Sequence, residues 1–214
     1  MPSENVVHVV DDDEAVRDSV AFLLRSAQLE VEVYESAVAF LGKAAGAAGC
    51  VVTDIRMPEM SGIDLMRRLK ELGTRLPVIV MTGHGDVPLA VEAMKAGAVD
   101  FIEKPFDEAT MLTAVRAALA RGEAVEKRDA ERAEIEKRLN GLSGREREVL
   151  LGLVRGQPNK IIAHNLGISP RTVEIYRANV MTKMNASSLS ELVRMALVAG
   201  ILGEPSDPKA SKRS

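Results

Sequence analysis

The chain has one cysteine, Cys50, among its 214 residues, no tryptophan, and only four Phe and two Tyr. A single cysteine excludes an intramolecular disulfide and a zinc site built from several cysteines, and it is typical of a reducing compartment. With so few aromatic side chains, the chain is poorly suited to binding single-stranded nucleic acid by base stacking.

Long apolar stretches are also missing. No run approaches the roughly 18 apolar residues that a membrane-spanning helix requires. Residues 1–13 pass from a short apolar stretch directly into acidic residues, without the basic segment and small-residue cleavage site of a signal peptide. We therefore expect a cytoplasmic protein with no membrane partner.

The composition is that of an ordinary globular protein, 46% apolar and 28% charged, but its charge is unevenly divided. Residues 1–121 carry a net charge of −7, residues 122–139 of −1, and residues 140–214 of +5. The length allows one large or two small domains. The charge division favours an acidic first domain and a basic last domain, of which only the basic one suits a polyanion such as DNA.

Five short apolar runs alternate with stretches of helical spacing over the first 121 residues. Four of the runs are mostly β-branched or otherwise apolar, as in strands buried on both faces. Five βα repeats predict an α/β domain with a five-stranded, parallel, doubly wound sheet whose chemistry lies at the carboxyl ends of the strands. The predicted strands are residues 6–10, 31–34, 50–53, 78–81 and 101–103.

Polar residues stand at the ends of four predicted strands. Three aspartates at 11–13 follow the first strand, Asp54 follows the third, Thr82 the fourth and Lys104 the fifth. An acidic triplet alone also fits a solvated turn or a helix N-terminus stabilised by negative charge. Four strand ends that each carry a chemically useful group favour a functional site.

The residue types at these ends suit phosphoryl chemistry. Clustered carboxylates around Asp54 need a cation to stay ionised together, and oxygen ligands favour Mg²⁺. A carboxylate beside Mg²⁺ can attack a phosphoryl group and form an aspartyl phosphate. Lys104 can supply positive charge to the phosphoryl oxygens, and Thr82 can donate a hydrogen bond to one of them.

Four separated motifs resemble the receiver domain of two-component response regulators over its whole length. They are VVDDD at 9–13, VTDIRMPEMSG at 52–62, MTGH at 81–84 and FIEKPF at 101–106. The resemblance implies a flavodoxin-like (CheY-like) fold and phosphorylation of Asp54. It also implies that the chain catalyses only its own phosphorylation and dephosphorylation and is otherwise no enzyme.

The resemblance implies a role for each residue of the site. The implied magnesium ligands, three carboxylates and one backbone carbonyl, are those of Asp11, Asp12, Asp54 and Arg56. Thr82 and Lys104 would contact the phosphoryl group. Phe101, which alone would fit a core position, would change rotamer as Thr82 moves. The peptide bond between Lys104 and Pro105 is implied to be cis.

Residues 122–139 form a charged segment, with 11 charged residues of 18 and no proline. Glu123 with Lys127, and Glu134 with Arg138, are spaced i,i+4 in the order that stabilises a helix. We therefore predict a helical linker. The alternative is a plain solvated spacer.

A different pattern begins near residue 140. Ser143 and Glu146 have the spacing of a capping box, and an apolar helical face follows. A second short helix, about 159–166, ends at Gly167, and Ser169 followed by proline starts a third helix. Two helices joined by a tight glycine turn predict a helix-turn-helix.

The third helix divides into an apolar face and an opposite face suited to a DNA major groove. The predicted base contacts are Glu174, Ile175 and Ala178. The predicted phosphate contacts, each with the alternative of an ordinary solvated side chain, are Asn159, Lys160, Arg171, Thr172, Arg177 and Lys183. Arg177 lies beside the apolar face, where a buried hydrogen bond is the alternative.

This second part resembles the LuxR-type helix-turn-helix, an all-α domain of four helices. Receiver plus LuxR-type domain is the architecture of the NarL/FixJ family, and the motifs are most similar to its FixJ branch. Many members carry lysine where this chain has Glu174 and histidine where it has Tyr176. A second apolar strip on the last helix, with Met195 and Val198, predicts pairing of two copies. The alternative is loose packing of this strip against the linker.

The two resemblances together predict the domains and the activity. We expect a receiver at 1–121, a helical linker at 122–139, a DNA-binding domain at 140–205 and a disordered tail at 206–214. The implied function is transcriptional activation of nitrogen-fixation-type genes after a FixL-like sensor histidine kinase phosphorylates the receiver. The implied partners are promoter double-stranded DNA, RNA polymerase and, when phosphorylated, a second copy of an otherwise monomeric chain.

Two other classes of function remain possible at this point. One is a magnesium-dependent phosphohydrolase with Asp54 as nucleophile, although phosphatases of the haloacid-dehalogenase type carry a second aspartate where this chain has Arg56. The other is a regulator that acts through protein partners without DNA.

Overall fold

The computed structural model describes residues 6–83 and 87–201. They form two compact units, with the division between Lys127 and Arg128. His84 of the MTGH motif and the predicted tail at 206–214 lie outside the described residues.

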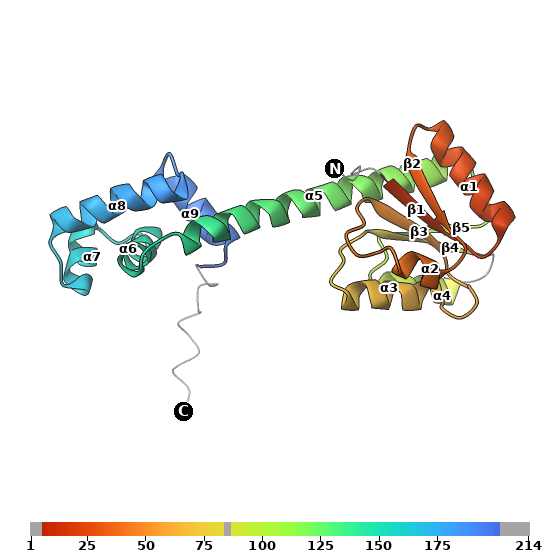
Figure 1. Cartoon of the computed structure of the whole chain (residues 1–214), viewed down its shortest axis with the longest axis horizontal. Coiled ribbons are helices and arrows are strands. Elements are labelled where there is room, and N and C mark those ends of the chain that lie inside the picture. Colours follow the sequence, from red (N-terminus) through yellow and green to blue (C-terminus); the bar gives the residue numbers. More distant parts are fainter. Residues whose placement is uncertain (1–5, 84–86, 202–214) are drawn as a thin grey trace, which may run out of the picture. The chain divides into compact units, whose positions relative to one another are not determined.

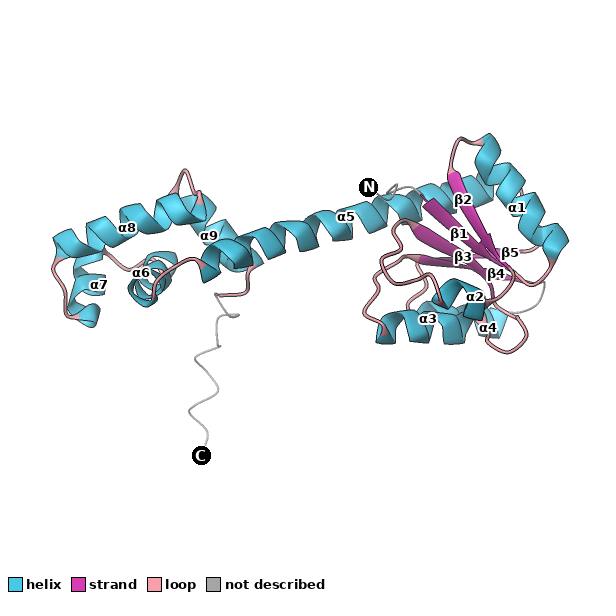
Figure 2. Cartoon of the chain, viewed as in Figure 1, coloured by secondary structure: helices cyan, strands magenta, loops and turns pink. Residues whose placement is uncertain are grey.

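The first unit is built on a five-stranded sheet with all strands parallel, in the order β2-β1-β3-β4-β5 (Figure 2). The chain order reverses between β1 and β3, which is the switch point where ligands bind in such sheets. The predicted doubly wound sheet is confirmed. Its strands are β1 (Val6–Val10), β2 (Glu30–Tyr34), β3 (Cys50–Asp54), β4 (Val78–Thr82) and β5 (Asp100–Glu103).

Burial differs between the middle and the edges of this sheet. Every residue of β1, β3 and β4 is buried, whereas β2 and β5 each bury only one residue. We predicted four strands buried on both faces, whereas three strands, β1, β3 and β4, are fully buried. The edge strands lie at the rim of the helix layers, where solvent reaches them.

Helices cover both faces of the sheet (Figure 1). On one face α1 and α5 contribute Leu24 and Met111 to the core, and on the other α2 and α3 contribute Phe40 and Leu65, joined by Ala93 of α4. The two-sided cover explains why the central strands are continuously apolar. The helices are α1 (Glu14–Ser26), α2 (Ala37–Leu41), α3 (Gly62–Glu71), α4 (Val87–Ala96) and α5 (Glu108–Asn140).

The segment predicted as a helical linker continues α5, which runs unbroken for 33 residues. Both predicted i,i+4 ion pairs are present, between Lys127 and Glu123 and between Arg138 and Glu134. The helix does not stay solvated, because Ile135 is buried in the core of the second unit. The last 13 residues of α5 therefore belong to the second unit.

As far as residue 201, where the described part ends, the regular structure of the second unit is helical (Figure 2). Ser143 and Glu146 form the predicted capping box, and Gly167 ends α7 with a positive φ of 65°. Ser169 caps α8 with Pro170 at its first turn, as predicted. These helices share one apolar core with the end of α5. Their bounds are α6 (Gly144–Val154), α7 (Asn159–Leu166), α8 (Pro170–Met184) and α9 (Leu189–Val198).

Candidate functional site

The carboxyl ends of β1, β3, β4 and β5 bring the predicted site residues together. Lys104 Nζ donates hydrogen bonds to Asp11 Oδ2 at 2.8 Å and to Asp54 Oδ1 at 2.5 Å. Asp11, Asp54 and Thr82 are all buried. Lys104 is 93 residues from Asp11 along the chain, so only the folded sheet makes this contact.

Burial and charge act on these groups in opposite directions. Burial raises the pKa of Asp11, and the hydrogen bond from Lys104 only partly offsets this. For Lys104, burial alone would lower the pKa. The hydrogen bonds and charges of Asp11 and Asp54 outweigh that effect and raise the pKa, so the ammonium stays protonated.

The backbone after β3 orients the Asp54 carboxylate. Asp54 Oδ2 accepts a hydrogen bond from the backbone N–H of Arg56 at 2.6 Å. The loop then folds back, and the N–H of Gly62 donates to the carbonyl of Ile55 at 3.1 Å. A Cβ at Gly62 would lie 2.4 Å from the carbonyl oxygen of Asp54, so glycine is required there. The sequence motif includes this glycine, but its spacing alone does not indicate the close approach.

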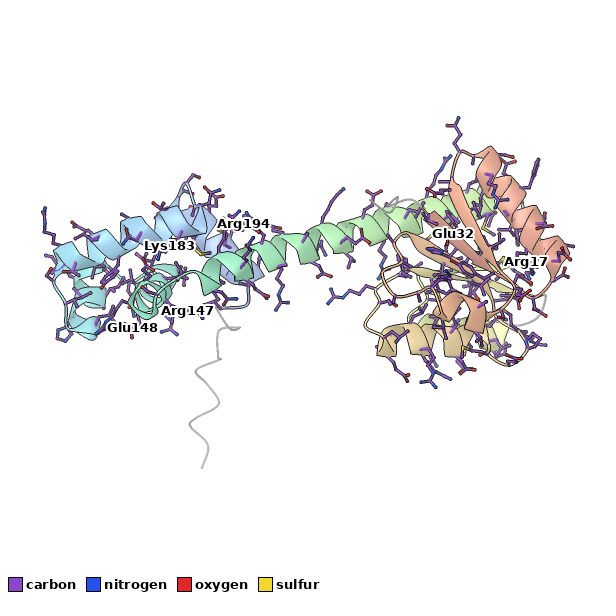
Figure 3. The ribbon with its side chains drawn as sticks, in the orientation of Figure 1. Arg17, Glu32, Arg147, Glu148, Lys183 and Arg194 are labelled. Atoms are coloured by element: carbon purple, nitrogen blue, oxygen red, sulfur yellow. The ribbon has the colours of Figure 1, made fainter. Side chains whose placement is uncertain are left out.

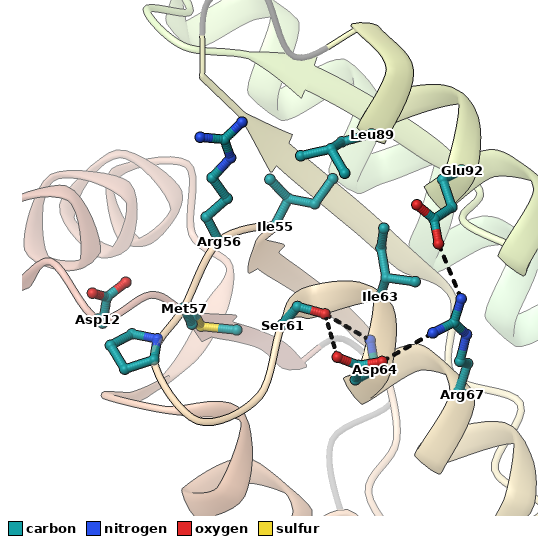
Figure 4. A pocket seen from close by; sticks show the side chains of 11 residues that line it. Asp12, Ile55, Arg56, Met57, Ser61, Ile63, Asp64, Arg67, Leu89 and Glu92 are labelled. Atoms are coloured by element: carbon teal, nitrogen blue, oxygen red, sulfur yellow. Dashed lines mark hydrogen bonds and ion pairs between the residues drawn. The ribbon is translucent and has the colours of Figure 1, made fainter.

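A cavity of about 660 Å³ opens beside Arg56 (Figure 4). Asp12 and Arg56 line one part of it. In another part Asp64 accepts hydrogen bonds from Ser61 and from Arg67, which also reaches Glu92. This network ties α3 to α4, and the cavity borders the loop that follows Asp54.

The three aspartates at 11–13 have separate roles. Asp11 is buried against Lys104, and Asp12 is exposed at the cavity. Asp13 caps α1, its Oδ1 accepting from the N–H groups of Ala15 and Val16. Stabilisation of a helix N-terminus, the alternative interpretation of the three aspartates, therefore explains Asp13 but not Asp11 or Asp12.

The residues fit a magnesium ion by their chemistry. In the described ranges, no three His, Cys, Asp or Glu side chains surround one point as a formed metal centre. Asp11 and Asp54 nevertheless already share one cation, the Lys104 ammonium, and Asp12 lines the neighbouring cavity. An all-oxygen set that converges on positive charge is what Mg²⁺ prefers.

The two predicted switch residues, Thr82 and Phe101, differ in their surroundings. Thr82 is buried at the end of β4, and its carbonyl accepts from the N–H of Lys104 at 2.7 Å. Phe101 on β5 is 46% exposed, so the interpretation of Phe101 as a core residue was wrong. The bond between Lys104 and Pro105 is cis, as expected.

The predicted DNA-facing surface of α8 is exposed. Val173, Val180 and Met184 are buried in the core of the second unit, while the three predicted base contacts on the opposite side are exposed. Ile175 is 58% exposed, so its apolar side chain is accessible on this face. These predicted base contacts are Glu174, Ile175 and Ala178.

The predicted phosphate contacts vary in how accessible they are. Lys160 and Arg171 are exposed, and Asn159 and Arg177 are half-buried. The Thr172 hydroxyl shares a hydrogen bond of 2.8 Å with Ser169 at the start of α8.

Lys183, predicted to contact DNA phosphate, already has an intramolecular partner. Its Nζ donates to Glu146 Oε2 at 2.7 Å (Lys183 is labelled in Figure 3). Glu146 Oε2 also accepts from the backbone N–H of Ser143 at 2.7 Å. Sequence analysis missed this pair, because the two residues lie on different helices, 37 positions apart. Glu146 thus joins the start of α6 to the last turn of α8.

The Glu146 pair predicts an acid-sensitive component of stability. The hydrogen bond from Lys183, then that from the Ser143 N–H, lowers the pKa of Glu146 to about 2. A depressed carboxyl pKa stabilises the fold above its unfolded value, about 4.3, and the contribution is lost as the pH falls toward 2. We expect the melting temperature of the second unit to fall less between pH 5 and pH 3 in E146Q than in the wild type. The matched control is E148Q on the same helix, which should keep the wild-type slope; equal slopes in E146Q and the wild type would contradict the prediction.

The comparisons with known proteins agree with this geometry. Residues 7–116 match the family described as response regulator receiver domain, and residues 140–196 match bacterial regulatory proteins of the luxR family. The chain belongs to the FixJ-type response regulators. It is 60% identical over 204 residues to the transcriptional regulatory protein FixJ of Azorhizobium caulinodans, an alignment that covers 94% of this chain and 96% of the relative.

Two solved structures resemble this regulator over most of its length. Full-length FixJ from B. japonicum is 51% identical, covers 94% of this chain and 99% of its own, and gives a TM-score of 0.58. The response regulator StyR is 41% identical, covers 91% and 99%, and gives a TM-score of 0.81. This protein is thus a phosphorylation-activated transcription regulator with a LuxR-type DNA-binding domain. The family match favours transcription regulation over the phosphohydrolase considered above.

The helices described in this structure lie within residues 6–83 and 87–201. None of them combines the length and the apolar character needed to cross a bilayer.

Proposed function

We propose that Asp54 accepts a phosphoryl group from a FixL-like sensor histidine kinase in the cytoplasm, and that the phosphorylated chain dimerises on promoter DNA. The observation that carries the proposal is the buried Asp54 carboxylate, whose Oδ1 lies 2.5 Å from the Lys104 ammonium. The relatives are named transcriptional regulatory protein FixJ, which supports regulation of transcription. Activation of nitrogen-fixation-type genes together with RNA polymerase is part of the same proposal. Outside this self-modification the chain is not an enzyme.

Asp54 acts as the nucleophile. One carboxylate oxygen attacks the phosphorus of a phosphohistidine or an acyl phosphate, the P–N or P–O bond breaks, and the leaving group takes the electron pair. Lys104 offers its charge to the phosphoryl oxygens, and the buried Thr82 hydroxyl donates to one of them. Asp11, Asp12, Asp54 and the carbonyl of Arg56 would hold Mg²⁺, which neutralises phosphoryl charge when bound.

The added phosphoryl group biases the molecule toward a second arrangement. It brings a charge of about −1.5 to −2 next to Thr82 and Lys104, which are drawn toward it. Phe101, half-exposed on β5, follows Thr82 and changes the surface of the receiver. A receiver surface changed in this way favours association with a second copy.

The second unit reads double-stranded DNA through α8. We assign base contacts to Glu174, Ile175 and Ala178, since they are exposed on one face of that helix. The basic and polar side chains around them position the helix on the backbone. The assigned phosphate contacts are Asn159, Lys160, Arg171, Thr172, Arg177 and Lys183.

The experiment uses the full chain with acetyl phosphate and Mg²⁺. Acid-quenched mass spectrometry should place one phosphoryl group on Asp54, and size-exclusion chromatography should show dimers only after labelling. Binding to double-stranded DNA selected from a random pool should tighten by about tenfold or more, equivalent to about 1.4 kcal/mol. Asp54→Asn should abolish all three changes.

Asp18→Asn is the matched control, because Asp18 is an exposed carboxylate on α1. It should behave as the wild type. Label on a residue other than 54, or labelled chains that stay monomeric, would refute the proposal. Rapid multiple turnover with release of inorganic phosphate would favour the phosphohydrolase, and labelled dimers without DNA affinity would favour action through protein partners.

A further inference from the structure

A second groove lies at the opposite end of the sheet from Asp54. Its lining includes Val78, the first residue of β4, whereas Thr82 of the phosphoryl site is the last. The groove has a cavity volume of about 400 Å³, within the size range of small-molecule sites. It is bounded by α3, the segment that leads into β4, the residues before β5, and α5.

The groove combines an apolar floor with a basic rim. Leu69, Pro77 and Val78 are buried in the floor. Lys70 of α3 and Arg121 of α5 line the rim and are exposed. Arg75 also lines the groove, and none of the lining residues is acidic.

Neighbouring acids do not neutralise the rim. Glu71 pairs with Arg68 at 2.9 Å, and Glu123 pairs with Lys127 at 3.5 Å. Within the part of the chain that the structure describes, Lys70 and Arg121 have no hydrogen-bond or ion-pair partner for their side chains. Two unpaired cations beside an apolar floor favour a ligand with one negative head and an apolar body.

We propose that this groove binds a small amphipathic anion, with a phosphate or carboxylate head at the basic rim that Lys70 and Arg121 line and an aliphatic body on the floor. Such a ligand contacts α3, the start of β4 and α5 at once. Arg121 and Val125 are four positions apart on α5 and therefore share the face that meets the ligand. Nothing in this proposal depends on phosphorylation of Asp54.

The experiment titrates the isotope-labelled full chain with hexyl phosphate and, separately, with hexanoate, in EDTA to keep metal from the phosphoryl site. We expect the amide resonances of Gly97 and Arg121 to shift with a Kd of about 1 mM for at least one of the two. Which head binds identifies the phosphate or the carboxylate as the preferred anion. Failure of both to bind overturns the proposal.

Two controls separate the proposed site from general attraction of anions. K70E/R121E should weaken binding by about tenfold or more, because charge reversal turns attraction into repulsion. K43E/R116E makes the same change of net charge at exposed receiver positions outside the groove and should bind as the wild type. Equal loss in both variants, or binding of inorganic phosphate or hexylammonium as tight as that of the two probes, overturns the proposal.

Discussion

Replacing Lys104 by methionine is expected to slow phosphorylation of Asp54 by acetyl phosphate by about a hundredfold or more, the usual effect of removing a positioned group that stabilises transition-state charge. Methionine keeps most of the length of the side chain but removes the ammonium that lies 2.5 Å from Asp54 and 2.8 Å from Asp11. The phosphoryl group on Asp54 then lacks the ammonium that pairs with this carboxylate in the structure. The rate is measured by acid-quenched mass spectrometry of the intact chain.

The same substitution leaves two buried carboxylates facing each other without a shared cation. Asp11 keeps the burial that raises its pKa but loses the hydrogen bond from Lys104 that lowers it. Folding stability should therefore fall at pH 7 and recover at acidic pH as this carboxyl is protonated. Lys43→Met, at an exposed position of the same unit, should change neither the rate nor the stability. A phosphorylation rate in K104M within about threefold of the wild type would show that Lys104 does not serve the phosphoryl group.

Gly62→Ala is expected to destabilise the first unit by about 1 to 3 kcal/mol, the typical cost of forcing an extra carbon into a packed region. The added Cβ would lie 2.4 Å from the carbonyl oxygen of Asp54 and 3.2 Å from Thr53 Cγ2. Backbone atoms at the end of a central strand cannot move aside cheaply, so β3 or α3 must shift. Urea unfolding of the full chain, followed with a probe in the first unit, measures the loss.

Gly42→Ala is the matched control for this substitution. Gly42 has a φ of −62°, and a Cβ there meets only ordinary contacts, the nearest at 3.5 Å from the carbonyl of Ala39. The free energy of unfolding of the Gly42→Ala variant should stay within about 0.5 kcal/mol of that of the wild type. If the two variants were equally stable, the close approach of α3 to Asp54 would not exist in solution. The Gly62 variant should also phosphorylate more slowly, because the shift displaces the nucleophile.

Local patterns were sufficient for the secondary structure. The apolar runs and the helical spacing predicted every strand within about one or two residues, because strand and helix formation depend on neighbouring residues. The capping signals at Ser143, Gly167 and Ser169 were likewise confirmed. The burial of the edge strands β2 and β5 was the exception. Exposure depends on which strand lies outermost, and the order of the strands is a property of the whole sheet.

The helical linker shows where local patterns stop. Two i,i+4 ion pairs predicted the helix, and both are present. Those pairs carry no information about Ile135 and Leu139, which are buried among the helices of the second unit. In addition, Arg138 donates to the carbonyl of Met184 at 3.1 Å, and Arg194 pairs with Glu131 (Arg194 is labelled in Figure 3).

The amino-acid sequence by itself determined the two folds, the strand ends that carry Asp11, Asp54, Thr82 and Lys104, and the family, because short-range periodicity and contiguous motifs record these features. Only the tertiary structure decided which charges meet. It brought Lys104 between two aspartates and paired Lys183 with Glu146. Within the ranges that the structure describes, it left the Lys70 side chain without a hydrogen-bond or ion-pair partner. Coulomb attraction and desolvation depend on distance and burial in space, and residues far apart along the chain acquire both only when the core packs.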